Sequence, residues 1–372
     1  MTEMTPATSQ EVAAALRDAS ARGLRVNVRG AGSKSRMGGP AQPADLTLST
    51  AALRRVLVYE PKDLTLSVEP GLPWSHLTAL LAAERQMLPL DPPCAAQATV
   101  GGVVLANCSG PRRRHYGAAR DMVIGMTYAT MDGALADCGG MVVKNVAGLD
   151  VQKALIGSFG TLAAVTVLNF KLAPLPEATR TFLLTFPSAQ ELAEARNRLL
   201  SGALQPTALD AFSPAAARAF ALDGWCLAVR ASGGPAVLAR YQQEFSGAQV
   251  LDGAPEADLW RLIEQFPAAH PYLARAGHPI SALADVLASS PGASVSRAGT
   301  GISYLAFDHR DALLAWWTNP ASARWSRVVE ASPGDLDEYW AAPGPELDWM
   351  KKLKAAFDPQ NLLNCGRLYG RL

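Results

Sequence analysis

A short glycine-rich segment is the first part of the sequence whose residue types and spacing suggest chemistry. Residues 29–35 read Arg-Gly-Ala-Gly-Ser-Lys-Ser, so Gly30, Ala31, Gly32 and Ser33 form a run without bulky side chains. Backbone N–H groups in such a run can approach an anion closely, and glycine also permits positive φ angles. The run therefore fits a diphosphate, and it fits a tight turn between two strands equally well.

This segment lacks the features of the common nucleotide-binding loops. A Rossmann site needs G-x-G-x-x-G at the start of a helix, whereas here Met37-Gly38-Gly39-Pro40 follows and opposes a helix. A Walker loop needs Gly-Lys-Ser/Thr, but Ser33 separates Gly32 from Lys34. The run Gly157-Ser158-Phe159-Gly160 has the wrong spacing for a nucleophile elbow.

A second segment offers the same kind of backbone. Residues 99–103 read Thr-Val-Gly-Gly-Val, and residues 107–110 read Asn-Cys-Ser-Gly. The surrounding stretch, 92–117, is rich in small residues and is predicted to be an ordered loop against which something packs. Two such segments outside the Rossmann pattern favour a dinucleotide that is held by backbone groups.

Other chemistries find little support. The five cysteines are widely spaced and include no C-x-x-C, and the five histidines show neither H-x-x-x-H nor H-x-H spacing. This pattern argues against a disulfide framework, a zinc site and an iron–sulfur cluster, so we expect no metal. A net charge of +1 gives no general attraction to nucleic acid or an anionic membrane. The basic run 112–115 is expected to be a solvated loop, with contact to an anion or a partner as the alternative.

The elements that position these segments can be read from hydrophobic periodicity and capping residues. A T-x-x-E capping box at Thr8 and Glu11 predicts a helix over 9–22. Strands are predicted at 24–28, 64–68, 122–130, 134–138 and 162–172, and a helix is predicted at 74–86. The loop after residue 28 is therefore expected to join one strand to another.

The pattern changes after Pro174 and Pro176. Two successive β-α-β units are predicted between 181 and 251, which suggests a sheet with helices on one face. Helices near 257–266 and 310–317 and an extended stretch over 294–307 follow, and a last helix is expected to end at Phe357. Hydrophobic residues make up 49% of the chain and charged residues 18%, which is typical of globular domains.

The ordered set of motifs resembles a known family. The motifs are 29–35, Ala98 to Gly102, Gly110 to Arg113, Tyr116-Gly117, Asp121, Val143 to Asp150, Gly157 to Leu162 and the tail Phe357 to Tyr369. Together they resemble the FAD-binding domain of the vanillyl-alcohol oxidase / p-cresol methylhydroxylase superfamily, and within it the FAD-binding subunits of bacterial glycolate oxidases. The likeness covers about residues 24–172 and the tail, where Cys365 stands in place of the usual proline.

The resemblance implies an α+β protein with a two-subdomain FAD-binding domain of the p-cresol methylhydroxylase type and an α+β cap domain. The expected boundaries are 1–174 for the FAD domain, with a subdomain split near residue 56, then 175–342 for the cap and 343–372 for a segment that returns to the FAD domain. The resemblance implies that cofactor contacts come from Gly30, Ala31, Gly32, Ser33, Lys34, Thr99, Gly101, Gly102, Ser109, Gly160, Thr161, Val165 and Asn364. Lys144 and Arg367 are the candidates for tuning the flavin, because a cation near its N1/O2 edge favours reduction.

Two departures from the family shape the functional prediction. Covalently flavinylated relatives have a histidine in the first loop, where this chain has Ser33 and Lys34, so we expect dissociable FAD. Catalytic 2-hydroxy-acid flavoproteins of the superfamily carry a histidine-rich motif in the C-terminal half, but the comparable stretch here, 297–304, contains none. No catalytic base can therefore be assigned from the sequence.

The resulting prediction is a noncovalent FAD subunit of a complex that oxidises glycolate to glyoxylate. Its expected partners are a catalytic flavoprotein sister subunit and an iron–sulfur subunit, and this chain would relay electrons or support assembly. We expect a cytoplasmic protein, without a leader or membrane span, that meets a membrane only through the complex. The alternatives are a self-sufficient FAD-dependent hydroxy-acid or alcohol dehydrogenase and a structural subunit that has lost the cofactor.

Overall fold

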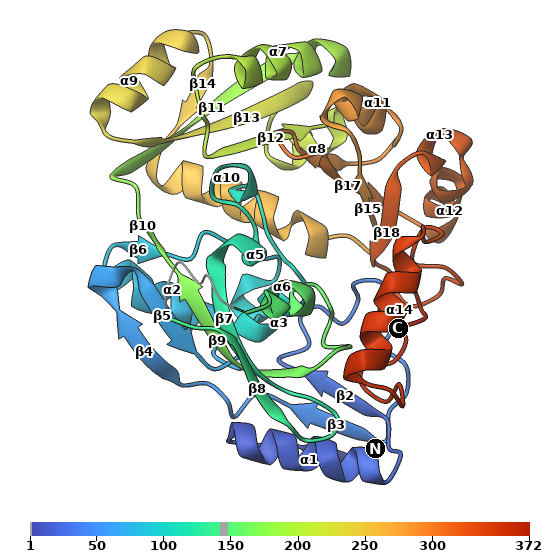
Figure 1. Ribbon diagram of the computed structural model, residues 1–372. Coiled ribbons are helices and arrows are strands. Elements are labelled where there is room, and N and C mark those ends of the chain that lie inside the picture. Colours follow the sequence, from blue (N-terminus) through green and yellow to red (C-terminus); the bar gives the residue numbers. More distant parts are fainter. Residues whose placement is uncertain (1, 142–147) are drawn as a thin grey trace. The chain divides into compact units, whose positions relative to one another are not determined.

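The computed structural model describes residues 2–141 and 148–372, and the chain divides into two compact units. Unit 1 consists of Met1–Ser109, Gly117–Leu175 and Ala342–Leu372, and unit 2 consists of Gly110–Tyr116 and Pro176–Ala341 (Figure 1). The short stretch Gly110–Tyr116, which holds the basic run, is part of unit 2. The sequence does not predict that this stretch, which interrupts unit 1 in the sequence, belongs to unit 2.

The first subdomain of unit 1 is a small parallel sheet with one helix. The strands are ordered β1 (Thr2–Met4), β3 (Leu46–Ser49), β2 (Val26–Arg29). Helix α1 (Ser9–Ala21) starts at the predicted capping box, because Thr8 Oγ1 accepts a hydrogen bond from the Glu11 amide at 3.1 Å. Its apolar stripe packs with the apolar residues of β2 and β3, and Figure 1 shows the helix alongside these strands. The loop after β2 joins it to β3, as the sequence predicts.

The second subdomain of unit 1 is an antiparallel sheet. Its strands are ordered β4 (Val56–Glu60), β5 (Thr65–Val68), β9 (Ala164–Lys171), β7 (Val123–Ala129) and β8 (Leu135–Gly139). The remaining elements of this subdomain are α2 (Trp74–Ala83), α3 (Val100–Leu105), α5 (Ala119–Met122), α6 (Val151–Leu155) and the strand pair β6 (Gln86–Met87) and β10 (Ala173–Pro174).

The stretch 92–117 is not simply a loop, which corrects the sequence prediction. It contains the helix α3, whose first turn is capped by Thr99 Oγ1 accepting from the Gly102 amide at 3.4 Å, and the short helix α4 (Arg113–Tyr116). Two glycines usually oppose a helix. Here Gly101 is required by packing, since a Cβ on it would lie 2.6 Å from Pro70 Cβ. Tertiary contact overrides the low helix propensity.

Unit 2 contains an eight-stranded antiparallel sheet that is built from two repeats of four strands, and the first repeat has an additional short helix between its second and third strands. In the first repeat the strands are ordered β14 (Gln249–Leu251), β11 (Ala178–Phe186), β13 (Trp225–Gly233), β12 (Ala208–Phe212), and in the second β16 (Ser294–Arg297), β17 (Ile302–Phe307), β15 (Tyr272–Gly277), β18 (Ser326–Ala331). Each repeat therefore has the order 4-1-3-2 of the split β-α-β motif, counted from opposite ends. The antiparallel pair β12–β16 joins the repeats into one sheet. The sequence indicates the first repeat but not the second.

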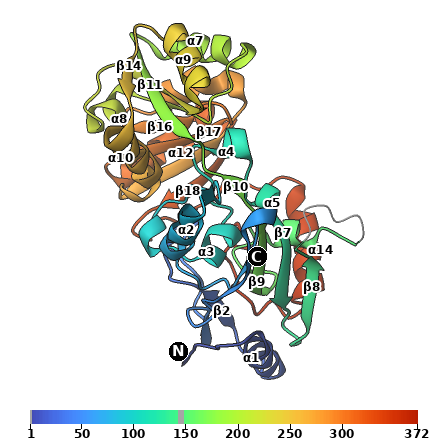
Figure 2. The same cartoon turned by 90° about the vertical axis from the view of Figure 1, so that its left-hand side faces the viewer.

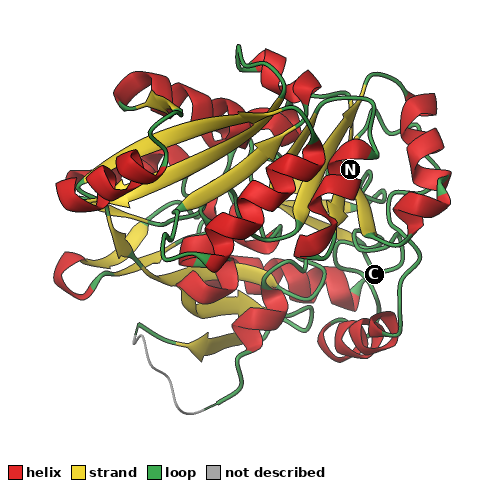
Figure 3. Cartoon of the chain, turned by 90° about the horizontal axis from the view of Figure 1, so that it is seen from above, coloured by secondary structure: helices red, strands yellow, loops and turns green. Residues whose placement is uncertain are grey.

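Helices cover both faces of this sheet, so the prediction of helices on one face is wrong. Helices α8 (Pro214–Ala219) and α10 (Gly253–Gln265) pack on one face, and α7 (Ala189–Ser201), α9 (Pro235–Glu244) and α11 (Leu283–Ala288) pack on the other (Figure 2). Figure 3 shows helices in red beside the yellow strands. The cause is visible in the strands. Successive residues of β12 and β13 are buried on both sides, so both faces need a cover. Two further helices, α12 (Arg310–Thr318) and α13 (Pro320–Ala323), complete the unit.

The C-terminal segment forms part of unit 1. It begins with α14 (Glu346–Phe357), and Leu362 and Leu363 then enter the same apolar cluster as α1. The buried Lys354 ammonium donates to Asp358 Oδ2 at 2.6 Å and to the Leu363 carbonyl at 2.7 Å. These contacts fix the chain after α14 against the first subdomain. No helix in the described ranges is both long and apolar enough to span a membrane.

Candidate functional site

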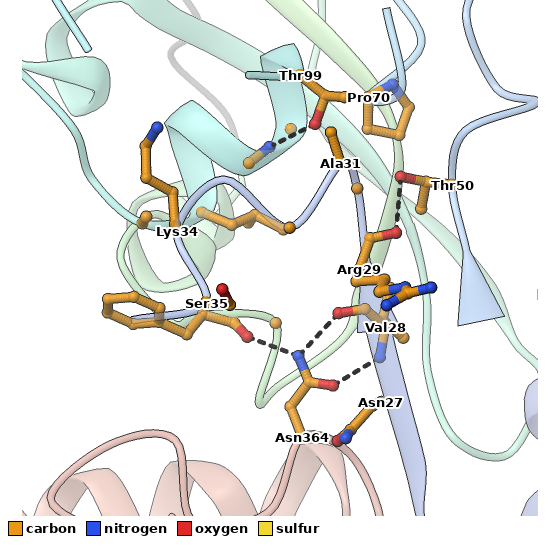
Figure 4. Close-up of a pocket in the computed structure, with 18 of the residues that line it drawn as sticks. Asn27, Val28, Arg29, Ala31, Lys34, Ser35, Thr50, Pro70, Thr99 and Asn364 are labelled. Atoms are coloured by element: carbon orange, nitrogen blue, oxygen red, sulfur yellow. Dashed lines mark hydrogen bonds between the residues drawn. The ribbon is translucent and has the colours of Figure 1, made fainter. Parts of the chain in front are cut away.

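A cavity of about 460 Å³ lies within unit 1. Its walls come from three separate parts of the chain: the end of β2 with the loop after it, the start of α3, and the C-terminal tail beside Phe159 and Gly160 (Figure 4). The two glycine-rich segments of the sequence therefore meet at one place. Hydrophobic and small residues make most of the wall, and a few polar groups are set into it.

The loop after β2 forms the first wall. The amides of Ala31, Gly32, Ser33 and Lys34 donate to no acceptor in the described part of the chain, whereas the Ser35 amide closes a turn onto the Gly32 carbonyl at 3.0 Å. Gly32 has a φ of 74°, and nothing lies within 4 Å of where its Cβ would be. A run of free amides around a left-handed glycine is a nest for an anion.

The other glycines at the cavity hold its walls together. A Cβ on Gly30 would lie 2.3 Å from Thr99 Oγ1, so Gly30 lets the first loop pack against the start of α3. A Cβ on Gly160 would lie 2.8 Å from the side-chain Nδ2 of Asn364, and Gly160 has a φ of 72°. These positions demand glycine because side chains, and not a ligand, fill the adjacent space.

Two buried cations line the cavity. Lys34 is 9% exposed, and its ammonium donates to the Pro93 carbonyl and to Ser33 Oγ. Arg367 is 7% exposed, and its guanidinium donates only to backbone carbonyls while it lies 5.1 Å from the centre of the Phe159 ring. Burial lowers the pKa of the Arg367 guanidinium. Neither cation has a carboxylate partner in the described part of the chain, so the cavity carries positive charge that favours an anionic ligand.

Asn364 ties the tail to both of the other walls. Its Oδ1 accepts from the Val28 amide at 2.7 Å, and its Nδ2 donates to the Phe159 carbonyl at 2.7 Å and to the Val28 carbonyl at 3.3 Å (Figure 4). Phe159 and Asn364 both have left-handed backbone, with φ of 54° and 44°. Such strain persists only where the surroundings fix it, and it concentrates at ligand sites.

Most of the residues predicted from the sequence come together here. Those that line the cavity are Gly30, Ala31, Gly32, Ser33, Lys34, Thr99, Gly101, Gly102, Gly160, Val165, Asn364 and Arg367. Ser109 and Thr161 are not among the lining residues. Thr161 is 1% exposed, and its hydroxyl donates to the Ser158 carbonyl at 2.8 Å, so it supports the wall from behind. Lys144 lies outside the described residues.

Sequence reasoning missed several residues of the wall. Thr50, Pro70 and Phe159 line the cavity but are not in the predicted set. Thr50 Oγ1 donates to the Arg29 carbonyl at 3.3 Å, and Pro70 meets Gly101. Phe159 lies inside the motif 157–162, whose glycines are its most visible feature in the sequence. The contact of Phe159 with Arg367 depends on the fold, so no local sequence pattern predicts it.

Unit 2 holds the segment in which relatives were expected to carry histidines. Arg297 ends β16 and Tyr304 lies within β17, and the Arg297 guanidinium lies 5.3 Å from the centre of the Tyr304 ring. Arg297 donates to the carboxylate of Asp210 on β12, and both side chains are buried. His278 Nε2 lies 2.8 Å from Ser303 Oγ, and burial is the main cause that lowers the pKa of this imidazole. Within residues 2–141 and 148–372, no group of three His, Cys, Asp or Glu side chains could hold a metal ion.

The fold and the cavity define a flavoprotein with an α+β cofactor domain. The model of the FAD binding domain family matches residues 3–139, and that of the FAD linked oxidases, C-terminal domain, matches residues 339–368. The chain therefore contains both domains of an FAD-linked oxidoreductase with a p-cresol methylhydroxylase-type FAD-binding domain, and its cofactor is FAD. These matches confirm the predicted fold class, resemblance and cofactor.

Individual relatives differ in how much of the chain they match. The glycolate oxidase subunit GlcE of Escherichia coli is 27% identical over 351 residues, which are 93% of each chain. The glycolate oxidase subunit GlcD of Bacillus subtilis is 28% identical, but the match covers 56% of this chain and 44% of that protein. A solved structure, alkyldihydroxyacetonephosphate synthase, matches with a TM-score of 0.73 at 15% identity over 97% of this chain and 75% of its own, which shows the same fold.

The residues at the cavity fit this cofactor. The free amides of the first loop and the cations Lys34 and Arg367 suit the two charges of a diphosphate. The small residues of α3 leave room for a flat ring system beside them. Lys34, Asn364 and the loop 30–33 are therefore our candidates for holding FAD.

Proposed function

We propose that this chain is a noncovalently FAD-binding subunit of a multi-subunit complex that oxidises glycolate to glyoxylate. The observation that carries the proposal is the pairing of an anion-binding cavity with a match to GlcE along 93% of both chains. GlcD, the other named glycolate oxidase subunit, would correspond to a sister flavoprotein.

Noncovalent attachment is supported by the composition of the wall. None of the described residues that line the cavity is His, Cys or Tyr, the side chains that usually form a covalent bond to flavin. The ammonium of Lys34 donates to the Pro93 carbonyl and to Ser33 Oγ, which leaves its third N–H for the cofactor. The cofactor would therefore be retained by the loop amides, by the two cations and by shape, and it would be released when the domain unfolds.

Bound FAD supplies the ability to accept two electrons and to pass them on singly or in a pair. The chain's own residues supply binding and orientation. The amides of 31–34 and Lys34 meet the diphosphate, Gly101 and Gly102 allow close approach, and Asn364 holds the three walls in register.

An accessory role in the complex fits the side chains of unit 2. A hydroxy acid needs a free cation for its carboxylate and a base for its hydroxyl proton. Arg297 is paired with Asp210, and Arg275 with Glu330, so these two cations are neutralised by their own carboxylates. Arg196 and Arg327 have no carboxylate partner in the described residues, but their guanidinium groups donate to carbonyl and hydroxyl oxygens of unit 2 itself. We therefore assign the hydride-accepting step on glycolate to the sister flavoprotein, and onward transfer to an iron–sulfur subunit. The complex would be cytoplasmic and would reach a membrane acceptor through its partners.

A second candidate is a self-sufficient dehydrogenase for another hydroxy acid. It is favoured by relatives that are named D-lactate dehydrogenase [cytochrome] in Arabidopsis thaliana, 29% identical over 41% of this chain, and D-2-hydroxyglutarate dehydrogenase in Rattus norvegicus, 30% identical over 51%. These matches cover 27% and 35% of the relatives, so they carry less weight than GlcE.

One preparation distinguishes the candidates. The purified full-length chain is expected to be yellow and to release FAD into the supernatant on acid precipitation. Glycolate and an artificial electron acceptor should give no turnover with the chain alone, and turnover should appear when the sister flavoprotein and the iron–sulfur subunit are co-expressed with it.

Two other results would reject the proposal. Robust turnover of glycolate or another hydroxy acid by the chain alone would favour the self-sufficient enzyme. Colourless protein that does not take up added FAD would indicate a structural assembly subunit.

A further inference from the structure

Side chains of the C-terminal tail form hydrogen bonds with backbone atoms around the cofactor cavity. Lys354 donates to the Thr161 carbonyl at 2.7 Å, and Asn364 bonds Val28 and Phe159. Arg367 donates to the loop after β2. Backbone groups on two walls are therefore held by side chains from a third, which makes the geometry of the site dependent on the docking of the tail.

Arg367 makes the most specific of these contacts. Its Nη1 donates to the Gly39 carbonyl at 2.6 Å and to the Ser35 carbonyl at 3.4 Å, and its Nη2 donates to the Lys34 carbonyl at 3.4 Å. The planar guanidinium offers several donors at fixed angles, so one side chain can satisfy acceptors from separate peptides. The Phe159 ring, 5.1 Å away, holds the plane of the group.

These contacts hold the turn of the loop after β2. The conformation of this turn leaves the amides of residues 31–34 without acceptors in the described part of the chain. The Lys34 carbonyl and the Ser35 amide belong to one peptide, and that amide donates to the Gly32 carbonyl at 3.0 Å. The Met37 amide donates to the same Lys34 carbonyl at 3.1 Å. By engaging the Lys34 carbonyl, Arg367 stabilises the Gly32–Ser35 turn, and this turn leaves the preceding amides without protein acceptors.

The burial of Arg367 has a second consequence. The guanidinium is 7% exposed and has no carboxylate partner in the described residues, so it is a buried charge stabilised by carbonyl dipoles and by the Phe159 ring. An anion in the adjacent cavity lowers the free energy of this arrangement. Docking of the tail and binding of a diphosphate should therefore favour each other, and by linkage the effect must be reciprocal.

We infer that Arg367 is a positioning residue that clamps the loop after β2 in its anion-binding form and couples docking of the tail to binding of the FAD diphosphate. This role differs from the flavin tuning predicted from the sequence, because the donors of Arg367 are directed at the loop. The inference rests on FAD as the cofactor and not on the proposed role in glycolate oxidation.

The test combines FAD affinity with amide hydrogen exchange on the full-length chain, in apo and FAD-loaded forms. In Arg367→Met the Kd for FAD should rise about 10- to 100-fold, since hydrogen bonds from a charged group are lost. The amides of Ser35 and Met37 should exchange at least several-fold faster even in the apo form. FAD should slow exchange across residues 364–368 in the wild type and do so much less in the variant.

Two further variants keep the result interpretable. Arg371→Met removes an exposed arginine from the same tail and should match the wild type in every measurement. Arg367→Lys keeps the charge but cannot reach three carbonyls, so it should fold at least as well as the methionine variant while the loop amides remain unprotected.

Three outcomes would overturn the inference. Weaker FAD binding with unchanged exchange at Ser35 and Met37 would assign Arg367 a direct contact with the cofactor. Wild-type protection of the Ser35 and Met37 amides in Arg367→Lys would show that a positive charge at this position is enough to hold the loop. Equal FAD affinity in Arg367→Met and Arg371→Met would remove any role in binding.

Discussion

Buried cations are treated differently at the cavity of unit 1 and on the sheet of unit 2. At the cavity, Lys34 and Arg367 are bound to carbonyl and hydroxyl oxygens and have no carboxylate partner in the described residues. On one face of the eight-stranded sheet, each arginine has its own carboxylate: Arg230 with Glu256, Arg297 with Asp210, and Arg275 with Glu330.

This difference indicates where a ligand belongs. A buried charge is unfavourable unless an opposite charge and hydrogen bonds compensate it. The sheet face that carries Arg230, Arg275 and Arg297 supplies that compensation within the chain, and Asp210–Arg297 does so at the strand pair that joins the two repeats of unit 2. On the other face of the sheet, the buried Arg196 donates only to backbone carbonyls. At the cavity of unit 1 no carboxylate of the described residues neutralises Lys34 or Arg367, and the diphosphate of FAD would supply negative charge there.

The largest expected effect comes from breaking the ion pair in unit 2. Asp210→Asn leaves the Arg297 charge buried without its partner, which should lower the free energy of unfolding by about 3 to 5 kcal/mol. Denaturant titration followed by tryptophan fluorescence suits this test, because Trp225, Trp260, Trp316, Trp317, Trp325 and Trp340 lie in unit 2.

Two controls accompany this variant. Asp223→Asn removes an exposed carboxylate from the same unit and should change little. The double variant Asp210→Leu, Arg297→Met should recover most of the lost stability, since apolar groups replace the whole pair. A stable Asp210→Asn protein would show that the pair is not needed to compensate Arg297.

An intermediate effect, on binding and not on folding, is expected at Lys34. Lys34→Met removes a buried ammonium that the protein itself does not neutralise, so the apo form should unfold at nearly the wild-type denaturant concentration. The Kd for FAD should rise about 10- to 100-fold, because a charge-assisted hydrogen bond is worth about 1.5 to 3 kcal/mol. Flavin fluorescence measures the affinity. Lys62→Met, at an exposed position of unit 1, is the matched control. If apo Lys34→Met were as unstable as Asp210→Asn, the difference between the two buried cations would disappear.

The smallest effect concerns pH. Burial, and to a lesser degree Arg196, lower the pKa of His278 below its ordinary value of 6.5. Above pH 6.5 this histidine is neutral in both states and its environment stabilises the fold fully. As the pH falls below 6.5 the unfolded state takes up the proton first, so the stability falls until the pH passes the lowered pKa of the folded state.

Comparison with His278→Gln isolates this contribution from the other histidines. The free energy of unfolding should decline more steeply between pH 7 and pH 5 in the wild type than in the variant. Parallel curves would mean that His278 does not titrate differently in the two states.

Local patterns predicted much of the fold. The capping box at Thr8 begins α1 where expected, since an Oγ acceptor three residues before an amide is a local signal. The glycine-rich segments that now line one cavity were also identified. The sequence does not predict the helix α3, because its Gly101 is required by contact with Pro70, which is not a sequence neighbour.

The sequence by itself determined many of the helices and strands, the change of pattern after Pro176 and the residue types that can meet an anion, because backbone preferences and hydrophobic periodicity act over a few residues. The tertiary structure decided which cations are compensated and by what. Arg297 and Asp210 are paired by strand register across 87 positions, and Arg367 meets the Gly39 carbonyl across 328. Electrostatic compensation depends on distance in space and on burial, and neither is encoded in local sequence.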